Sequence, residues 1–230
     1  MMIEKESFLQ WFYTEIPKTL FPQIAAQVLF RCENCGECCR GEGYALVDEA
    51  DVQVMACAQG ISPSKARARF TDPDPGKNPG CRILKSIGPD RSCCLLDVQA
   101  KRCTIYSHRP RICRTFPMLN ADTESEEILC FYSDCLGTAK FVKMLQENRC
   151  DPKVQKDIES LTMQEERIEE LQILLFVWLR RMMGEIEEAE HICRITEISL
   201  PQESAFRRDC LAYFLMTITT DRLDEYQYEG

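Results

Sequence analysis

The chain has 230 residues, of which 45% are hydrophobic, and this apolar content is enough to bury a core. Its formal net charge of −9 argues against a broad interface with nucleic acid or with an anionic membrane, because such an interface needs a basic face. The most apolar run, residues 171–179, is shorter than the roughly 20 residues of a membrane-spanning helix. We therefore expect a folded protein with no membrane span and no nucleic-acid partner.

The first part of the chain is predicted to contain short helices and one strand. Apolar and aromatic residues at roughly helical spacing over residues 7–30, interrupted by two prolines, predict one or two short helices. After a cysteine-rich loop, GYALVD is typical of a short strand, and Asp48 is expected to cap a helix that runs to about Gln59. Ser62 and the proline after it predict the start of a second short helix.

The middle of the chain is predicted to be compact and irregular. The segment TDPDPGKNPG has the composition of a loop. The segments CRILKS, CCLLD and CTIY are typical of short strands. Pro110 is expected to open or break a short helix.

The last third is predicted to be helical and acidic. Between Leu171 and Ile186, apolar residues repeat at the i, i+3, i+4, i+7 spacing of a long amphipathic helix, and another helix is expected to start near Pro201. This apolar stripe packs either on the protein's own core or on a protein partner, and we expect the helical region to offer such a partner surface. The fold class predicted is α+β, with a small irregular cysteine-rich core of short strands and helices plus a helical C-terminal region. The expected divisions are an N-terminal helical segment (1–30), a cysteine-cluster metal-binding domain (31–137) and an acidic α-helical region (138–230).

Cysteine is the most unusual component of the chain, with 15 cysteines against two histidines. The first residues, MMIEKESFLQWFYTEIPK, lack the basic start, apolar run and small-residue cleavage site of a secretory signal. We therefore expect a cytoplasmic location, where thiols stay reduced and available for metals or redox chemistry. A disulfide framework is the alternative, and the odd number of cysteines disfavours it. A metal site in this chain is expected to be rich in thiolates.

The stretch CENCGECC, residues 32–39, places four thiols within eight residues. Its first three cysteines are spaced so that one loop can surround three sides of a metal centre, with Gly36 relieving the tight backbone. Bacterial ferredoxins take three ligands of a cubane cluster from a C-x2-C-x2-C run. Zinc is the alternative, because C-x2-C pairs also form half of a tetrahedral zinc site. Cys38 and Cys39 are adjacent, so we expect them to face two centres, or one of them to lie in the core.

CENCGECC, GYALVDEADVQVMA and CLLDVQAKRCTIYSHRPRICRTFP together resemble the YkgJ-type CxxCxxCC cysteine-cluster family, which is described as zinc- or iron-chelating. The resemblance spans residues 32 to about 137. It implies eight candidate metal ligands: Cys32, Cys35, Cys38, Cys39, Cys93, Cys103, Cys113 and Cys135. Either Cys93 or the adjacent Cys94 could be the ligand at that place. The cysteines outside this set are expected to behave as small hydrophobic side chains, and two of them, Cys81 and Cys130, could instead supplement a metal site.

A basic segment, residues 101–114, has five Lys or Arg and no acid. Within it, Arg109 and Arg114 flank Cys113 and are predicted to contact the cofactor by offsetting the negative charge of metal-bound thiolates. The alternative is a solvated helix face or an ion pair with the acidic C-terminal region. His108 is expected on the surface.

The first functional hypothesis is a metal-binding protein with an iron–sulfur cluster of the [4Fe-4S] type, acting as an accessory or electron-transfer component. The resembled family includes flagellin lysine N-methylase-like proteins, so the second hypothesis is an iron–sulfur-dependent protein lysine N-methylase or a related oxidoreductase. The third is a zinc-binding scaffold for a protein partner. The sequence shows no recognisable loop for the methyl donor and no catalytic residues, so it leaves open whether the chain is an enzyme.

Overall fold

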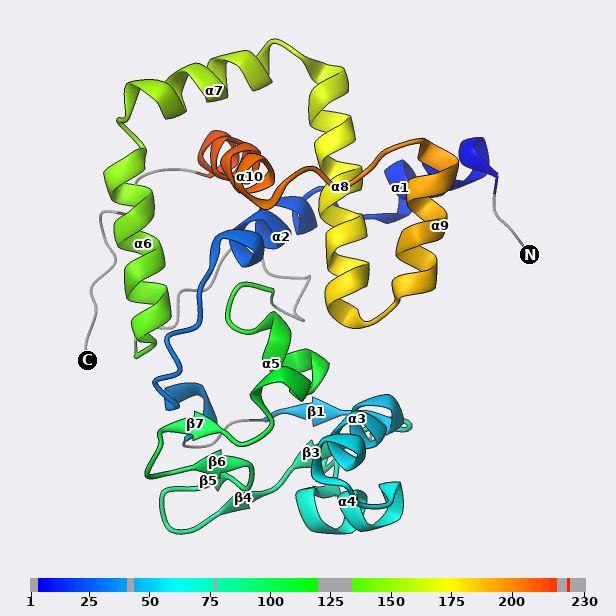
Figure 1. Ribbon diagram of the computed structural model, residues 1–230, viewed down its shortest axis with the longest axis vertical. Coiled ribbons are helices and arrows are strands. Elements are labelled where there is room, and N and C mark those ends of the chain that lie inside the picture. Colours follow the sequence, from blue (N-terminus) through cyan, green and yellow to red (C-terminus); the bar gives the residue numbers. More distant parts are fainter. Residues whose placement is uncertain (1–3, 41–43, 77, 120–133, 219–222, 224–230) are drawn as a thin grey trace. The chain divides into compact units, whose positions relative to one another are not determined.

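The computed structural model describes residues 4–40, 44–76, 78–119, 134–218 and 223 (Figure 1). The chain divides into two compact units. The helical unit contains residues up to Arg31 and the described residues from Pro117 onwards, apart from 134–136. The cysteine unit contains Cys32–Phe116 and residues 134–136. The architecture is α+β, as predicted, because the helices are accompanied by small antiparallel strand pairs.

The helical unit is built around a buried helix, α2. Its helices are α1 (Lys5–Glu15), α2 (Leu20–Leu29), α6 (Leu136–Asn148), α7 (Pro152–Thr162), α8 (Glu165–Met183), α9 (Ile186–Thr196) and α10 (Glu203–Thr217). All but the first residue of α2 is buried, because α8 and α10 pack against it. Phe12 of α1 lies between Phe21 and Phe176, with both ring centroids 5.5 Å away. Helices from both ends of the chain therefore share one core.

Helix α8 confirms the predicted long helix but differs from the predicted single apolar stripe. It ends at Met183, where Gly184 adopts φ +89°, and Ile186 opens the next helix with 46% of its surface exposed. Every residue from Ile173 to Val177 is buried. The reason is that α2, α7, α9 and α10 all pack on α8, so more than one of its faces is covered.

Leu175 lies at the centre of this packing and is fully buried. We expect Leu175→Ala to lower the free energy of unfolding by about 2–5 kcal/mol, because the cavity left behind closes only in part. Both tryptophans of the chain, Trp11 and Trp178, belong to helices of this unit, so urea unfolding followed by tryptophan fluorescence reports on it. Met163→Ala, at a side chain 84% exposed, is the control and should change stability by less than about 0.5 kcal/mol. Equal stability of the two variants would contradict this packing.

The cysteine unit begins with a short 3-10 helix, η1 (Glu37–Cys39), and a layer of helices beside a small sheet. Strand β1 (Leu46–Val47) leads into α3 (Glu49–Gln59) and α4 (Pro63–Phe70). As predicted, α3 starts at the cap Asp48 and ends at Gly60, which adopts φ +60°. Strands β2 (Thr71–Pro73) and β3 (Arg82–Leu84) complete an antiparallel sheet in the order β1-β3-β2.

Two hairpins and a short helix follow, and they carry most of the later cysteines of the motif. The hairpins pair β4 (Ser86–Ile87) with β5 (Ser92–Cys93) and β6 (Leu96–Asp97) with β7 (Arg102–Cys103). The 3-10 helix η2 (Tyr106–His108) and α5 (Arg111–Thr115) complete the unit. The predicted strand CCLLD is divided between two hairpins, and CTIY is extended only at its first residue, since Tyr106 already begins η2.

A compact apolar cluster supports these short elements. Val47, Val52, Met55, Phe70 and neighbouring side chains from α3, α4 and the strands form it. Four half-buried cysteines pack against its edge: Cys93, Cys94, Cys103 and Cys113. In neither unit does the described part of the chain contain a helix with the length and hydropathy needed to cross a membrane.

Candidate metal centre

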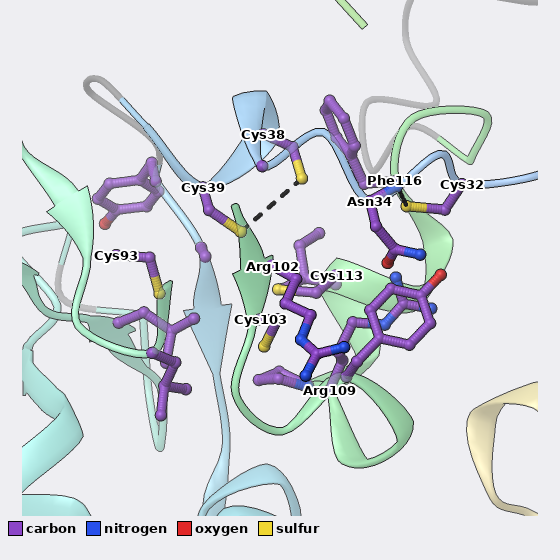
Figure 2. Close-up of a pocket in the computed structure, with 18 residues that line it drawn as sticks. Cys32, Asn34, Cys38, Cys39, Cys93, Arg102, Cys103, Arg109, Cys113 and Phe116 are labelled. Atoms are coloured by element: carbon purple, nitrogen blue, oxygen red, sulfur yellow. Dashed lines mark hydrogen bonds between the residues drawn. The ribbon is translucent and has the colours of Figure 1, made fainter. Parts of the chain in front are cut away.

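Six cysteines line one cavity of about 270 Å³ in the cysteine unit (Figure 2). They are Cys32, Cys38, Cys39, Cys93, Cys103 and Cys113. Three come from the CENCGECC loop, one from each of the strands β5 and β7, and one from helix α5. The fold therefore gathers thiols from all three cysteine-bearing segments of the sequence motif around one cavity.

The CENCGECC loop is fixed by its glycine. Gly36 adopts φ +79°. The Cys39 N–H donates to the Gly36 carbonyl oxygen at 3.0 Å, and this bond forms η1. A Cβ atom on Gly36 would lie 2.9 Å from the backbone oxygen of Lys101, in the turn between β6 and β7. The Asn34 N–H also points to the Cys32 sulfur, at 3.4 Å. The loop can therefore approach the β6–β7 hairpin closely only because position 36 lacks a side chain.

We expect Gly36→Ala to destabilise the metal-free protein more than Gly80→Ala. Both glycines have positive φ, so both substitutions carry the left-handed backbone cost of about 1–2 kcal/mol. A side chain at Gly80 meets nothing within 4 Å, whereas one at Gly36 meets the Lys101 backbone. Urea unfolding followed by far-ultraviolet circular dichroism measures the difference. An equal loss for the two variants would show that the loop does not depend on this close approach.

The two hairpins present one cysteine each. Cys93 pairs with Ser86 across β4–β5, and Cys103 pairs with Leu96 across β6–β7. Cys93 is the last residue of β5, and Cys94 lies in the turn that follows. Cys93 lines the cavity, whereas the Cys94 thiol donates to the carbonyl oxygen of Phe70 at 3.5 Å. The backbone thus directs Cys93, rather than Cys94, to the cavity.

Positive charge at the cavity comes from two arginines. Arg109 lines the cavity, as its predicted role requires, and its guanidinium carbon lies 3.8 Å from the ring centroid of Tyr106. Arg102 also lines it and was missed in the sequence, although it lies in the basic segment 101–114. Arg114 is not among the lining residues. Burial lowers the pKa of Arg114, while the charge of Asp51 raises it.

Apolar side chains also line the cavity. Leu84, Leu95, Ile112 and Phe116 contribute carbon surface, and the lining residues that the structure describes include no carboxylate and no imidazole. The donors available to a metal in this cavity are therefore thiols. This set matches the preference of zinc and of iron–sulfur clusters for cysteine ligands. Within the described ranges, however, no group of three His, Cys, Asp or Glu side chains already has the arrangement needed to hold a metal ion.

The crowded thiols do not ionise alike. The hydrogen bond from Cys39, at an Sγ–Sγ distance of 3.9 Å, lowers the pKa of Cys38 to about 7, and the charge of Arg109 contributes. The neighbouring Cys94 side chain lowers the pKa of Cys93 to about 7. The pKa values of Cys39 and Cys94 are raised in turn. Burial, together with the nearby Cys93 and Cys38, raises the pKa of Cys113 to about 12.

Several predicted residues lie away from this cavity. Cys35 is half-buried and Cys135 is buried, and neither lines it. His108 is exposed, as expected. Among the cysteines expected to be ordinary hydrophobic side chains, Cys210 is fully buried, whereas Cys57 and Cys150 are exposed. Cys130 lies outside the described residues.

The unequal pKa values predict unequal alkylation of the reduced, metal-free protein. Cys38 is exposed and has a pKa of about 7, so its reaction with iodoacetamide should accelerate strongly between about pH 6 and about pH 8, because only the thiolate reacts. Cys39 should react slowly at both pH values because its pKa is raised. Mass spectrometry of labelled peptides distinguishes the two positions. Equal labelling of Cys38 and Cys39 at the lower pH would contradict the hydrogen bond between them.

A comparison with known families identifies the cysteine-bearing segment. Residues 31–136 match the family model "CxxCxxCC: Putative zinc- or iron-chelating domain". No solved structure matches the chain significantly. All six cavity cysteines fall inside the matched segment, which supports metal binding by this part of the chain. This match confirms the resemblance to the CxxCxxCC family that the sequence motif predicted, over less than half of the chain.

Proposed function

We propose that the cysteine unit binds an iron–sulfur cluster of the [4Fe-4S] type through the cavity thiols and serves as an accessory or electron-transfer component. The observation that carries this proposal is the number of thiols that line one cavity. Six cysteines line the cavity, whereas a structural zinc ion is complete with four ligands. A cluster also takes four cysteines, but it is a larger body whose ligands can come from separate segments of the chain.

When bound, an iron–sulfur cluster supplies one-electron redox chemistry. The residues of this chain hold it and adjust its surroundings. Four of the cavity thiolates would ligate it, and the guanidinium groups of Arg102 and Arg109 would offset negative charge on the thiolates. Leu84, Leu95 and Phe116 would limit the access of water, which affects the reduction potential.

The composition of the cavity also suits a metal cluster. Histidine and the carboxylates are frequent general acids and bases, although tyrosine and cysteine can serve as well. The lining residues in the described part of the chain offer thiols, two arginines and two tyrosines, but no histidine, aspartate or glutamate. The proposal therefore assigns the cavity residues to holding a metal cluster.

Analysis of protein purified without air tests the proposal. We expect iron and acid-labile sulfide in near-equal amounts and a brown colour from charge transfer. Serine at Cys38, Cys93, Cys103 or Cys113 should lower the iron content, because each substitution removes a thiolate ligand. Serine at Cys57 and at Cys150 provides matched controls, since both thiols are exposed and outside the cavity.

The iron–sulfur proposal and the zinc-binding hypothesis predict opposite results in this experiment. A colourless protein with stoichiometric zinc and no sulfide would replace the iron–sulfur proposal by the zinc-binding scaffold. Unchanged metal content in all four cavity variants would remove the cavity as the metal centre. In the metal-bound protein, the cavity thiols should be protected from iodoacetamide, whereas Cys57 and Cys150 should label as in the metal-free protein.

A further inference from the structure

The short helix α5, which carries Cys113, is anchored by a residue of another helix. It has five residues, and its N-cap residue Pro110 makes no side-chain capping bond. Instead, the Arg111 N–H donates to the carboxylate oxygen Oδ1 of Asp51 at 2.9 Å. Asp51 lies 60 residues earlier in the chain. An isolated helix of this length is not stable in water, so its placement depends on such contacts.

Asp51 joins α3 to α5 because one of its carboxylate oxygens accepts a hydrogen bond from within α3 and the other accepts one from α5. In α3, the Asp51 N–H donates to Asp48, and the Asp48 N–H donates to Oδ2 of Asp51, which is the capping box at the start of that helix. Oδ1 of Asp51 accepts the bond from Arg111 and lies 3.8 Å from the Arg111 Nε. The Arg111 guanidinium also hydrogen-bonds the Asp48 carboxylate.

Burial makes this junction specific. Asp51 is 4% exposed, and a buried carboxylate is costly unless hydrogen bonds and opposite charge compensate it. Arg111 supplies both from α5. A displacement of α5 would leave the Asp51 carboxylate with only its partner within α3, so the first turn of α5 is held in one place.

Cys113 is two residues after Arg111 and lies in the same turn as the anchored N–H group. Two other cavity cysteines, Cys93 and Cys103, lie on strands and are held in place by strand pairing. Cys113 has no such ladder, and its position follows from that of α5. Asp51 itself does not line the cavity, so it cannot act as a ligand there.

We propose that Asp51 is a positioning residue for the metal centre, which fixes α5 so that the thiol of Cys113 faces the cavity. The inference rests on the proposed function only in that the cavity thiols bind a metal. It assigns Asp51, which is not among the candidate metal ligands, a role in the geometry of that centre.

The test measures Co²⁺ binding to the full-length, reduced, metal-free protein. Competition with a chromophoric chelator gives the affinity, and the intensity of the thiolate-to-Co²⁺ charge-transfer band reports the number of bound thiolates. Asp51→Ala should weaken binding by about 10- to 100-fold and reduce the band, as loss of a residue that orients a ligand does. Asp51→Asn should restore most of both signals, because its amide oxygen can still accept the Arg111 N–H.

Asp74 provides a matched control in the same unit. It is 8% exposed and accepts the N–H groups of Gly76 and Asn78, but only within its own loop. Asp74→Ala should leave the charge-transfer band unchanged even if it lowers stability. An equal decrease of the band in Asp74→Ala and Asp51→Ala would overturn the inference, because burial of a carboxylate would then explain both.

A double-mutant cycle asks whether Asp51 acts through Cys113. In a Cys113→Ser background, Asp51→Ala should weaken Co²⁺ binding no further, since the thiol that it positions is already absent. In a Cys103→Ser background, the effect of Asp51→Ala should persist. Additive effects with Cys113→Ser would overturn the inference.

A pair of substitutions at Arg111 keeps the test decisive should Asp51→Ala fail to fold. Arg111→Ala removes the guanidinium but keeps the N–H group, whereas Arg111→Pro removes both at the first helical position, where proline is well tolerated. We expect weaker Co²⁺ binding for the proline variant than for the alanine variant, and equal binding would contradict the anchoring bond. If the wild-type protein gave no thiolate–Co²⁺ band, the proposed metal function would fail and the inference with it. A normal wild-type band with no effect at Asp51 would sink the inference alone.

Discussion

The mutual repulsion of crowded thiolates is the constraint on which the cysteine unit depends. Six thiols line one cavity. The hydrogen bond to Cys38 and burial raise the pKa of Cys39, and burial with the charges of Cys93 and Cys38 raises that of Cys113. The protein alone therefore develops only part of this charge, with the pKa of Cys38 and of Cys93 at about 7 and that of Cys113 at about 12. A bound metal centre favours the remaining thiolates, because a thiol that coordinates a metal loses its proton. Four thiolates around a divalent centre leave about two negative charges, and Arg102 and Arg109 supply two positive charges beside them.

The same constraint explains the irregular fold of this unit. Its strands are two or three residues long, and hairpins of that length have little stability of their own. The apolar cluster of α3, α4 and the sheet supports one side of the unit, whereas the cavity side presents sulfur and arginine instead of a hydrocarbon core. On that side, metal binding would contribute to folding, as in other small metal-binding modules.

Local features of the sequence predicted local structure well. The helix from Asp48 to Gly60 was predictable because a capping carboxylate and a terminal glycine act within a few residues of the helix. The approach of Cys32, Cys93 and Cys113 to one site followed from the family motif. The bond from Arg111 to Asp51 was not predictable, since the two residues are 60 positions apart and nothing in either segment marks the pairing. The exclusion of Cys35 and Cys135 from the cavity, and the direction of the Cys94 thiol toward the Phe70 carbonyl, likewise depend on strand and loop geometry rather than on spacing.

The six cavity thiols differ in how firmly the fold holds them. Cys93, Cys103 and Cys113 belong to paired strands or to the anchored helix α5, whereas Cys32, Cys38 and Cys39 lie on a loop with one short 3-10 turn. In the described residues no three ligands have yet converged on a single point, so metal binding needs a small movement of thiols. That movement costs the least free energy on the loop, because no strand pairing and no hydrogen bond to a buried carboxylate has to be broken there. Position 36 has to remain glycine for the loop to lie this close to the β6–β7 turn, since a Cβ atom there would lie 2.9 Å from the Lys101 backbone oxygen. The structured half of the site therefore sets the geometry to which the CENCGECC loop adapts.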